Sequence, residues 1–263
     1  MSSKKKDFSY SEKVSTSITK EIASPDNPFV SVKQLIHGYD LTSLVQERSF
    51  LDTVFLLITG HLATTEQEKL LNALAVALCN LGPRAYPCRA AMVAGVSKSN
   101  AGNLLPIGLS VASGADGGSK EVEESHHFIA THINDDPSAL ANELTSHLEK
   151  ESDEFVVTAG FSSQFKHPHE LYISLANTLL EQHQCHTLEW ALLFSQAISH
   201  TGASINPCGL AAAVLFDLGI PARESGVLYQ FLIAPGILAH GLEQTHKPIT
   251  SIPFLSDDKY EFN

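Results

Sequence analysis

The chain has 263 residues, of which 43% are hydrophobic and 17% charged, and 29 acidic residues against 17 lysines and arginines give a formal net charge of −12. This acidic balance disfavours nucleic-acid binding, because phosphate contacts need a basic surface, and it disfavours attachment to a membrane through a basic patch. A chain of this length forms one large domain or two smaller ones, and it buries enough surface to fold without a disulfide or a metal.

The N-terminal segment is polar and weakly patterned, so residues 1–22 are expected to form a flexible arm. Its charged start has no apolar stretch behind it, which predicts that no signal peptide directs export. The four cysteines form no CxxC pair, which is typical of reduced thiols in the cytoplasm. The sequence therefore predicts a cytoplasmic protein, with a small hairpin over residues 29–36 after the arm.

Helical spacing of apolar residues dominates the rest of the chain. It starts at Leu41 and ends at Gly60, and overlapping capping boxes at residues 64–68 begin a helix that ends at Leu81. Further helices are expected over residues 88–96, 101–112, 118–133, 137–150, 170–185, 187–199, 207–218 and 224–244. Because no long alternating pattern appears, the predicted fold class is all-α. Polar residues and a proline interrupt the apolar stretch 226–242, which is expected to be a buried helix and not a membrane span.

Histidines are numerous, and the densest groups lie at residues 123–132 and 183–186. Neither group has the HExxH or Cys/His spacing of a tetrahedral zinc site. Solvated helix faces explain these residues better, so no metal site is expected.

Two turns before helices are candidates for chemistry. Residues 113–119 are rich in glycine, which lets a backbone approach a ligand closely. This segment lacks the lysine of a phosphate loop, so it indicates a turn or a small anion site and not a nucleotide site. The second turn places Cys208 at the start of an apolar helix, where a thiol is either reactive, with a lowered pKa, or a small core residue.

Motifs in chain order carry a resemblance to a known family. The opening pair is His-Gly-Tyr-Asp-Leu at residues 37–41 and Phe-Leu-Asp-Thr-Val-Phe-Leu-Leu-Ile-Thr-Gly at residues 50–60. The closing pair is Asn-Pro-Cys-Gly with its apolar helix and Leu-Gly-Ile-Pro at residues 206–221, then Ala-Pro-Gly-Ile-Leu-Ala-His-Gly-Leu-Glu at residues 234–243. This ordered set resembles the citrate synthase superfamily, and the length is similar to that of its short forms near the citryl-CoA lyases.

The resemblance implies a citrate synthase-like homodimer. A large helical domain of residues 23–117 and 222–263 and a smaller one of residues 118–221 would close over an acyl-CoA. A coenzyme A thioester is the implied substrate, and no tightly bound cofactor is expected. In this family an Asp takes the α-proton, one His stabilises the enolate at the thioester, and a second His polarises the keto partner.

All three catalytic positions have changed identity. The family's His-Gly-Gly falls on residues 116–118, its Gly-Phe-Gly-His on residues 160–163 and its Asn-x-Asp-Gly on residues 206–209. The candidate catalytic residues are therefore Asp116, Ser163 and Cys208. The resemblance further implies contacts with the acyl-CoA from Gly117, Gly118, Phe161, Lys166 and His167.

The family's arginines are also absent from their positions. The clamp arginine of the last long helix falls on Ile233, the opening Arg-Gly-Tyr begins with His37, and the Asp-Pro-Arg segment has no counterpart near His169. Bidentate arginine pairs hold carboxylates in this family. Only four arginines occur in the chain, none at these positions, so citrate synthase and citryl-CoA lyase activities are not expected.

Two functions remain open. The first is an enzyme of altered chemistry on an acyl thioester, with Asp116 as a base of raised pKa, Ser163 as an oxyanion donor, and Cys208 as a nucleophile or a space-filling residue. The second is an inactive relative that binds an acyl-CoA or pairs with an active paralogue, because a fold says little about function once its site has changed.

Overall fold

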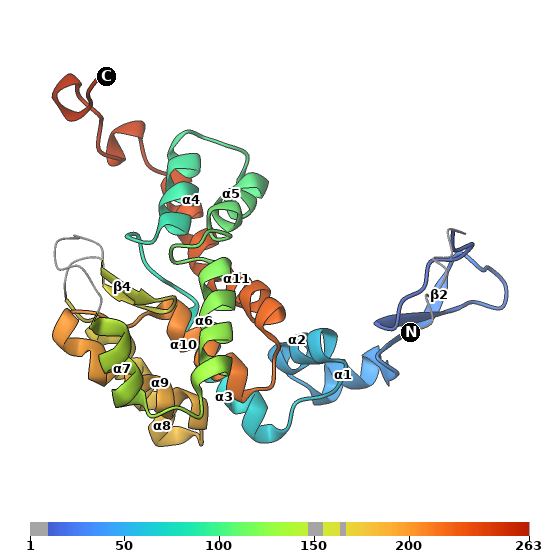
Figure 1. The fold of residues 1–263 in the computed structure, drawn as a ribbon. Helices are drawn as coiled ribbons and strands as arrows, with labels where there is room; N and C mark the ends of the chain where they lie inside the picture. Colours follow the sequence, from blue (N-terminus) through green and yellow to red (C-terminus); the bar gives the residue numbers. More distant parts are fainter. Residues whose placement is uncertain (1–9, 147–154, 164–166, 263) are drawn as a thin grey trace. The chain divides into compact units, whose positions relative to one another are not determined.

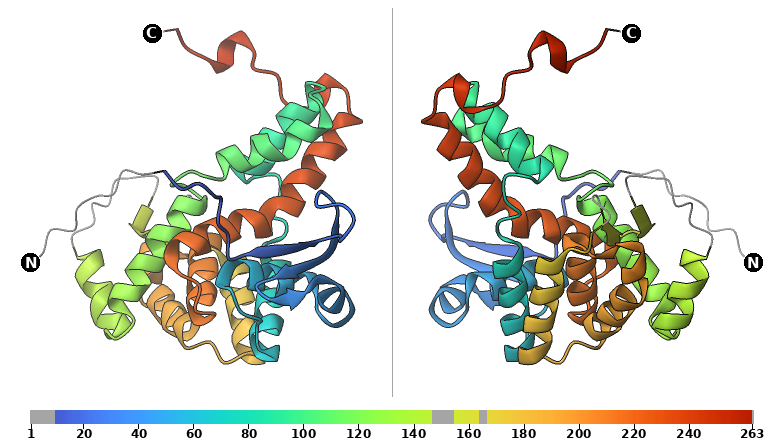
Figure 2. Two further views of the ribbon diagram at one scale, coloured as in Figure 1. Left: turned by 90° about the vertical axis from the view of Figure 1, so that its right-hand side faces the viewer. Right: turned by 90° about the vertical axis from the view of Figure 1, so that its left-hand side faces the viewer.

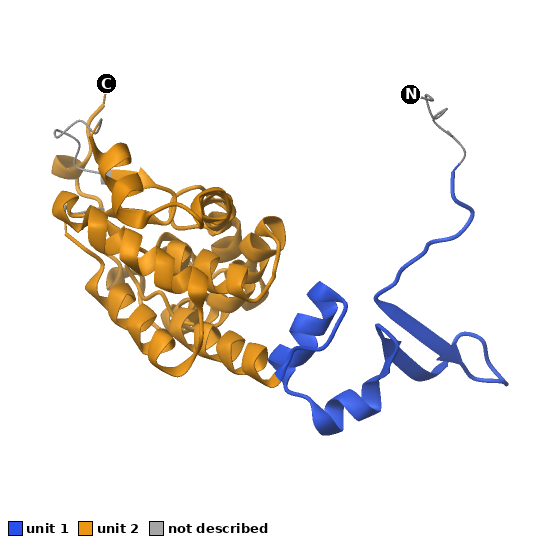
Figure 3. Ribbon diagram, turned by 60° about the horizontal axis from the view of Figure 1, so that its bottom comes forward, with its two compact units in different colours: residues 1–64 blue, residues 65–263 orange. Residues whose placement is uncertain are grey.

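The computed structural model describes residues 10–146, 155–163 and 167–262. The chain forms two compact units, Met1–Thr64 and Thr65–Asn263 (Figure 3). These units do not coincide with the domains expected from the resemblance. The division into a large and a small helical domain stays a prediction, as does the homodimer.

The first unit contains a small antiparallel sheet in the order β1-β2-β3, followed by two helices. Its elements are β1 (Thr19–Ala23), β2 (Ser31–Ile36), β3 (Tyr39–Asp40), α1 (Leu41–Glu47) and α2 (Phe50–Thr59). Residues 19–22 were expected to belong to a flexible arm but form most of β1. The hairpin expected over residues 29–36 is instead one strand, β2, which pairs with β1. A tight turn at His37 and Gly38, both with positive φ, leads from β2 into β3.

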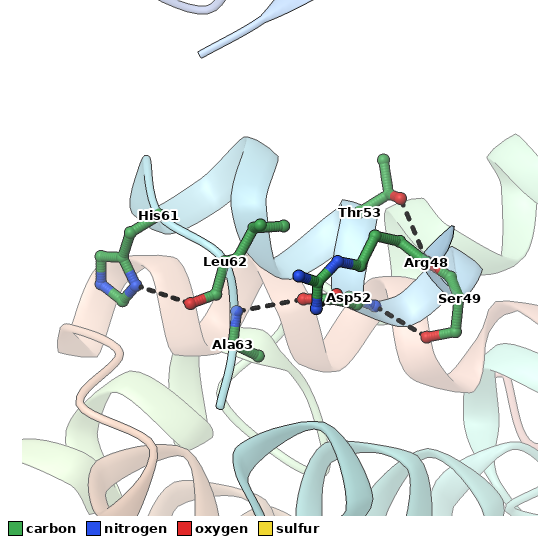
Figure 4. Close-up of polar contacts among 7 residues, drawn as sticks. All are labelled: Arg48, Ser49, Asp52, Thr53, His61, Leu62 and Ala63. Atoms are coloured by element: carbon green, nitrogen blue, oxygen red, sulfur yellow. Dashed lines mark hydrogen bonds and ion pairs between the residues drawn. The ribbon is translucent and has the colours of Figure 1, made fainter. Parts of the chain in front are cut away.

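The helical spacing over residues 41–60 is divided between two helices at Arg48, because Ser49 caps α2 by accepting a hydrogen bond from the amide of Asp52. Asp52 is fully buried: its Oδ1 accepts from the amide of Ala63 at 3.0 Å, and its Oδ2 lies 3.3 Å from a guanidinium nitrogen of Arg48 (Figure 4). The end of α2 at Gly60, with a left-handed φ of 83°, is as the sequence predicts. One buried carboxylate thus ties the start of α2 to the chain that follows it.

The second unit holds the remaining helices (Figure 1). They are α3 (Thr65–Leu78), α4 (Tyr86–Val96), α5 (Leu104–Val111), α6 (Ser119–His132), α7 (Pro137–Thr145), α8 (Glu170–Gln182), α9 (His186–Ile198), α10 (Pro207–Asp217) and α11 (Ala222–Thr245). Each expected helix is confirmed with its ends moved by a few residues. The expected end of α7 at Lys150 lies outside the described residues.

The helix α11 organises this unit by packing against α4, α5, α6 and α10 (Figures 1 and 2). Small residues bring these helices close: the Cβ of an alanine at Gly95 would meet the carbonyl oxygen of Gly241 at 2.3 Å. Among the described helices α11 is long and apolar enough to cross a membrane, but half of its apolar window is buried inside the structure. Its packing confirms the expected buried helix.

A second small sheet lies beside α10 and was not expected from the sequence. The strands β4 (Phe155–Thr158), β5 (Phe161–Ser163) and β6 (Ser204–Ile205) pair antiparallel in that order. The turn between β4 and β5 contains Gly160, whose carbonyl accepts a hydrogen bond from the amide of Asn206. The sheet thereby holds this turn against the start of α10. Because both sheets are small, the fold remains mainly helical, as the sequence predicts.

Candidate functional site

A cavity of about 730 Å³ opens in the second unit where several connections meet. Its wall comes from the α3–α4 connection and the first turn of α4, the loop before α6, strand β5, the start of α8, the start of α10, and α11. The polar and charged residues among the lining are Arg84, Tyr86, Arg89, Asp116, Glu121, Ser162, His169, Glu170, Tyr172, Asn206 and Tyr229. This wall combines carboxylates, guanidinium groups, an imidazole and phenols, which is enough variety for binding and proton transfer.

Glu121, in the first turn of α6, fixes three of these segments to one another. Its Oε2 accepts a hydrogen bond from the amide of Gly117 at 2.6 Å. Its Oε1 accepts from the amide of Gly160 at 3.0 Å and from Nδ2 of Asn206 at 2.7 Å. Because these three donors belong to three different segments of the wall, Glu121 is a positioning residue.

Asn206 is the N-cap of α10. Its Oδ1 accepts from the amides of Cys208 and Gly209, at 2.9 and 3.1 Å, which satisfies two otherwise free donors of the helix. Its Nδ2 donates to Glu121 and also to Oγ of Ser162 at 3.0 Å. The side chain of Asn206 therefore caps α10 and also links this helix to Glu121 of α6 and Ser162 of β5.

The structure separates the residues proposed from the sequence into two groups. Asp116 and Gly117 line the cavity, with Asp116 exposed to solvent. Ser163 is buried, and its Oγ both accepts from the amide of His167 and donates to the carbonyl of the same residue, each at 2.8 Å. Cys208 is fully buried. Among the described residues, then, one of the three proposed catalytic side chains faces the cavity.

The proposed acyl-CoA contacts separate in the same way. Gly118 and Phe161 are buried behind the wall, and Phe161 packs edge-on against Phe194 with ring centroids 4.9 Å apart. His167 is exposed, and Lys166 lies outside the described residues. Gly117 is the one of this group that the described structure places in the wall.

Of the two interpretations left open for Cys208, the structure favours the small core residue over the reactive thiol of lowered pKa. Burial raises the pKa of this thiol well above its ordinary value, and the nearby charge of Glu121 raises it further. Its Sγ lies 3.7 Å from the carbonyl oxygen of Gly118. The helix N-terminus favours a thiolate at Cys208, but the burial of this side chain has the larger effect on its pKa and cannot be read from the sequence.

We predict that native Cys208 resists alkylation by iodoacetamide up to about pH 9, because burial both blocks the reagent and keeps the thiol protonated. Cys79, which is half-buried at the end of α3, is the internal control and should react first. The measurement is the time course of carbamidomethylation at each cysteine by peptide mass spectrometry. Labelling of Cys208 as fast as that of Cys79 would contradict the prediction.

His169 and Tyr229 are cavity residues that the sequence reasoning did not assign to the site. The amide of His169 donates to Oγ of Ser204 at 2.7 Å, and burial lowers the pKa of its imidazole, which favours the neutral form. The hydroxyl of Tyr229 donates to the carbonyl of Gly117 at 3.3 Å, and burial raises the pKa of this phenol well above its ordinary value. The cavity thus holds a neutral imidazole able to accept a proton and a phenol able to donate a hydrogen bond. The position of His169 in a turn with His167 and Pro168 was a signal in the sequence that polar groups converge there.

Arg84 and Arg89 are two of the four arginines in the chain, and both line the cavity. The sequence reasoning examined only the family's arginine positions and missed them. Among the described residues no group of three or more His, Cys, Asp or Glu side chains is placed to hold a metal ion.

No protein-family model matches the chain, and no curated protein matches its sequence. Solved structures do match its fold. Citryl-CoA lyase from Hydrogenobacter thermophilus superposes with a TM-score of 0.72 at 20% sequence identity, over 95% of this chain and 94% of that one. ATP citrate lyase from Methanothrix soehngenii, in complex with citrate and coenzyme A, gives a TM-score of 0.70 at 13% identity, over 97% of this chain and 44% of that one.

Citrate synthase from Thermoplasma acidophilum, in a ternary complex with carboxymethyl coenzyme A and oxaloacetate, gives a TM-score of 0.61 at 17% identity. That match covers 82% of this chain and 57% of the citrate synthase chain. These likenesses agree with the order of motifs read from the sequence. The chain has the fold of the citrate synthase superfamily.

Proposed function

We propose that this chain is an enzyme that acts on an acyl thioester in the cavity of its second unit, with coenzyme A as the carrier, and that it lacks citrate synthase activity. The reaction class is the formation or cleavage of a C–C bond next to the thioester, or transfer of its acyl group. The observation that carries the proposal is that Asp116, His169 and Tyr229 all line one cavity. The fold adds support, because its solved examples include citryl-CoA lyase and citrate synthase.

The chemistry needs a base for the α-proton and donors for the oxyanion that develops at the thioester carbonyl. In this proposal Asp116 takes the proton, because it is the exposed carboxylate in the wall that lies at a catalytic position of the motif. The C–H electron pair moves into the enolate, whose oxygen accepts hydrogen bonds from the wall. Tyr229 is one donor, once its hydroxyl turns to the enolate oxygen from the carbonyl of Gly117. Ser163 and Cys208 then act through the segments they hold, since both are buried behind the wall.

A second candidate is a binding protein without turnover. The burial of Ser163 and Cys208, at two of the three catalytic positions, favours it. Such a protein would bind an acyl-CoA in the same cavity and release it unchanged.

The test incubates the purified protein with a panel of acyl-CoAs, with and without small keto acids, and detects products by mass spectrometry. We expect a new product from at least one thioester and a 10²- to 10⁴-fold lower rate, as an order of magnitude, in Asp116→Asn. Acetyl-CoA with oxaloacetate should give no citrate. Binding of acyl-CoAs without any product would overturn the enzyme and support the binding protein, and citrate formation near one turnover per second would overturn the loss of citrate synthase activity.

A further inference from the structure

We propose that Arg84 and Arg89 form an anion-binding subsite in the cavity wall, and that the substrate carries an oxyanion group which these two side chains hold. The inference rests on the proposed function and adds a substrate class to it. A carboxylate on the acyl group and a phosphate of coenzyme A share the chemistry that two guanidinium groups recognise.

The two arginines have no partner within the described part of the chain. Both side chains are exposed and line the cavity, and no ion pair or hydrogen bond joins either of them to a described residue. The contrast is Arg48 in the first unit, which pairs with the buried Asp52. An arginine left unpaired beside a cavity has its donors available for a ligand.

Three carboxylates line the same cavity, and none of them neutralises the arginines. The oxygens of Glu121 are occupied by three donors from Gly117, Gly160 and Asn206. Asp116 and Glu170 line the wall as well, but among the described residues neither lies within ion-pair distance of a guanidinium group. The positive and negative groups of the wall are therefore kept apart, which suits a ligand that carries both an anion and a site of proton transfer.

The first turn of α4 adds to the positive side of the cavity. Ala85 is its N-cap and supplies no side-chain hydrogen bond, and Pro87 occupies the first turn. Helix N-termini attract anions through free amides and the helix dipole. Arg84, Ala85, Tyr86, Pro87 and Arg89 all line the cavity, so the uncapped helix start and both guanidinium groups belong to one wall.

The charge of the chain as a whole does not attract anions, because the formal net charge is −12. The cavity wall also carries three carboxylates beside its two arginines, so an anion would be held by direct contact with Arg84 and Arg89 and not by the net charge. Arg223, in the first turn of α11, is also exposed but does not appear in the cavity wall. It is therefore a matched control for a solvated surface arginine.

The experiment measures dissociation constants by calorimetry for four stable thioether analogues. They are S-(2-carboxyethyl)-CoA, S-propyl-CoA and the corresponding two pantetheine thioethers, which lack the phosphates of coenzyme A. Each is titrated into the wild type, Arg84→Met, Arg89→Met and Arg223→Met, after thermal melts have shown that all four proteins are folded. Inorganic pyrophosphate and succinate are titrated as free anions.

Loss of one charge-assisted contact should weaken binding by about 10- to 100-fold. If the anion is the acyl carboxylate, Arg84→Met and Arg89→Met weaken both carboxyethyl ligands and leave both propyl ligands unchanged. If it is a phosphate of coenzyme A, they weaken both CoA ligands and neither pantetheine. In both cases Arg223→Met binds as the wild type does.

Unchanged affinity of the Arg84 and Arg89 variants for every ligand that the wild type binds would overturn the subsite and leave the proposed function standing. If the wild type bound no thioether but bound pyrophosphate or succinate in an arginine-dependent way, the subsite would stand and the thioester function would fail. Binding of none of the six ligands by the wild type would overturn both.

Discussion

Replacing Glu121 by alanine should destabilise the second unit by about 3–5 kcal/mol, because it leaves three donors without their acceptor and opens a space beside them. The donors are the amides of Gly117 and Gly160 and Nδ2 of Asn206, at 2.6 to 3.0 Å from the carboxylate. An unsatisfied buried donor costs about 1–3 kcal/mol. Since these donors belong to three different segments of the wall, the cavity should lose its shape along with the stability.

The measurement is the free energy of unfolding from urea denaturation, followed by circular dichroism. Glu124→Ala is the matched control: it lies on the same helix, is exposed, and is 3.7 Å from the ammonium group of Lys120. Its loss should change stability by less than about 1 kcal/mol. Glu121→Gln should fall between the two, because its amide retains one acceptor oxygen but turns a donor toward other donors. A Glu121→Ala variant as stable as Glu124→Ala would contradict the role given to this carboxylate.

Local signals in the sequence were sufficient to predict the helices. Gly60 ends α2 with a left-handed φ, and Asp136 and Pro137 start α7 by capping and by the fit of proline in a first turn. The strands were harder to predict: the hairpin expected over residues 29–36 is the single strand β2, and β5 and β6, with three and two residues, are too short for an alternating pattern. Helical periodicity thus recovered the architecture but not the strands that shape the cavity edge.

The site was harder to predict, because its contacts join residues distant in sequence. Glu121 reaches Gly160 across 39 positions and Asn206 across 85, and no pattern of spacing indicates such a pairing. Asp116 and Gly117 were found through the motif they occupy, and both line the cavity. Cys208 shows the opposite case: the motif assigns it to a catalytic position, but its side chain is buried, and this burial depends on the packing of α6 and α11 around α10.

Gly160 and Gly209 approach each other so closely that a side chain at Gly209 should destabilise the protein. A Cβ atom at Gly209 would lie 2.2 Å from the carbonyl oxygen of Gly160 and 3.1 Å from a side-chain carbon of Ile205. The first of these neighbours is backbone, so it moves only if the β4–β5 turn moves with it. That turn is held by Glu121 and by the amide of Asn206, which donates to the same carbonyl.

Gly209→Ala should therefore lower the free energy of unfolding by at least about 3 kcal/mol, at or beyond the upper end of ordinary overpacking costs. Gly219→Ala is the control, just beyond the other end of α10: its φ is +73° but nothing lies within 4 Å of the added Cβ. It should cost only the strain of a left-handed alanine, about 1–2 kcal/mol. The free energies of unfolding of both variants are measured by urea denaturation, which distinguishes the steric clash at Gly209 from the backbone strain at Gly219. Equal free energies of unfolding for the two variants would contradict the close approach of Gly209 to Gly160. Because the clash pushes the Gly160 turn away from Glu121, Gly209→Ala should also weaken binding of the thioether analogues, whereas Gly219→Ala should leave their affinities unchanged.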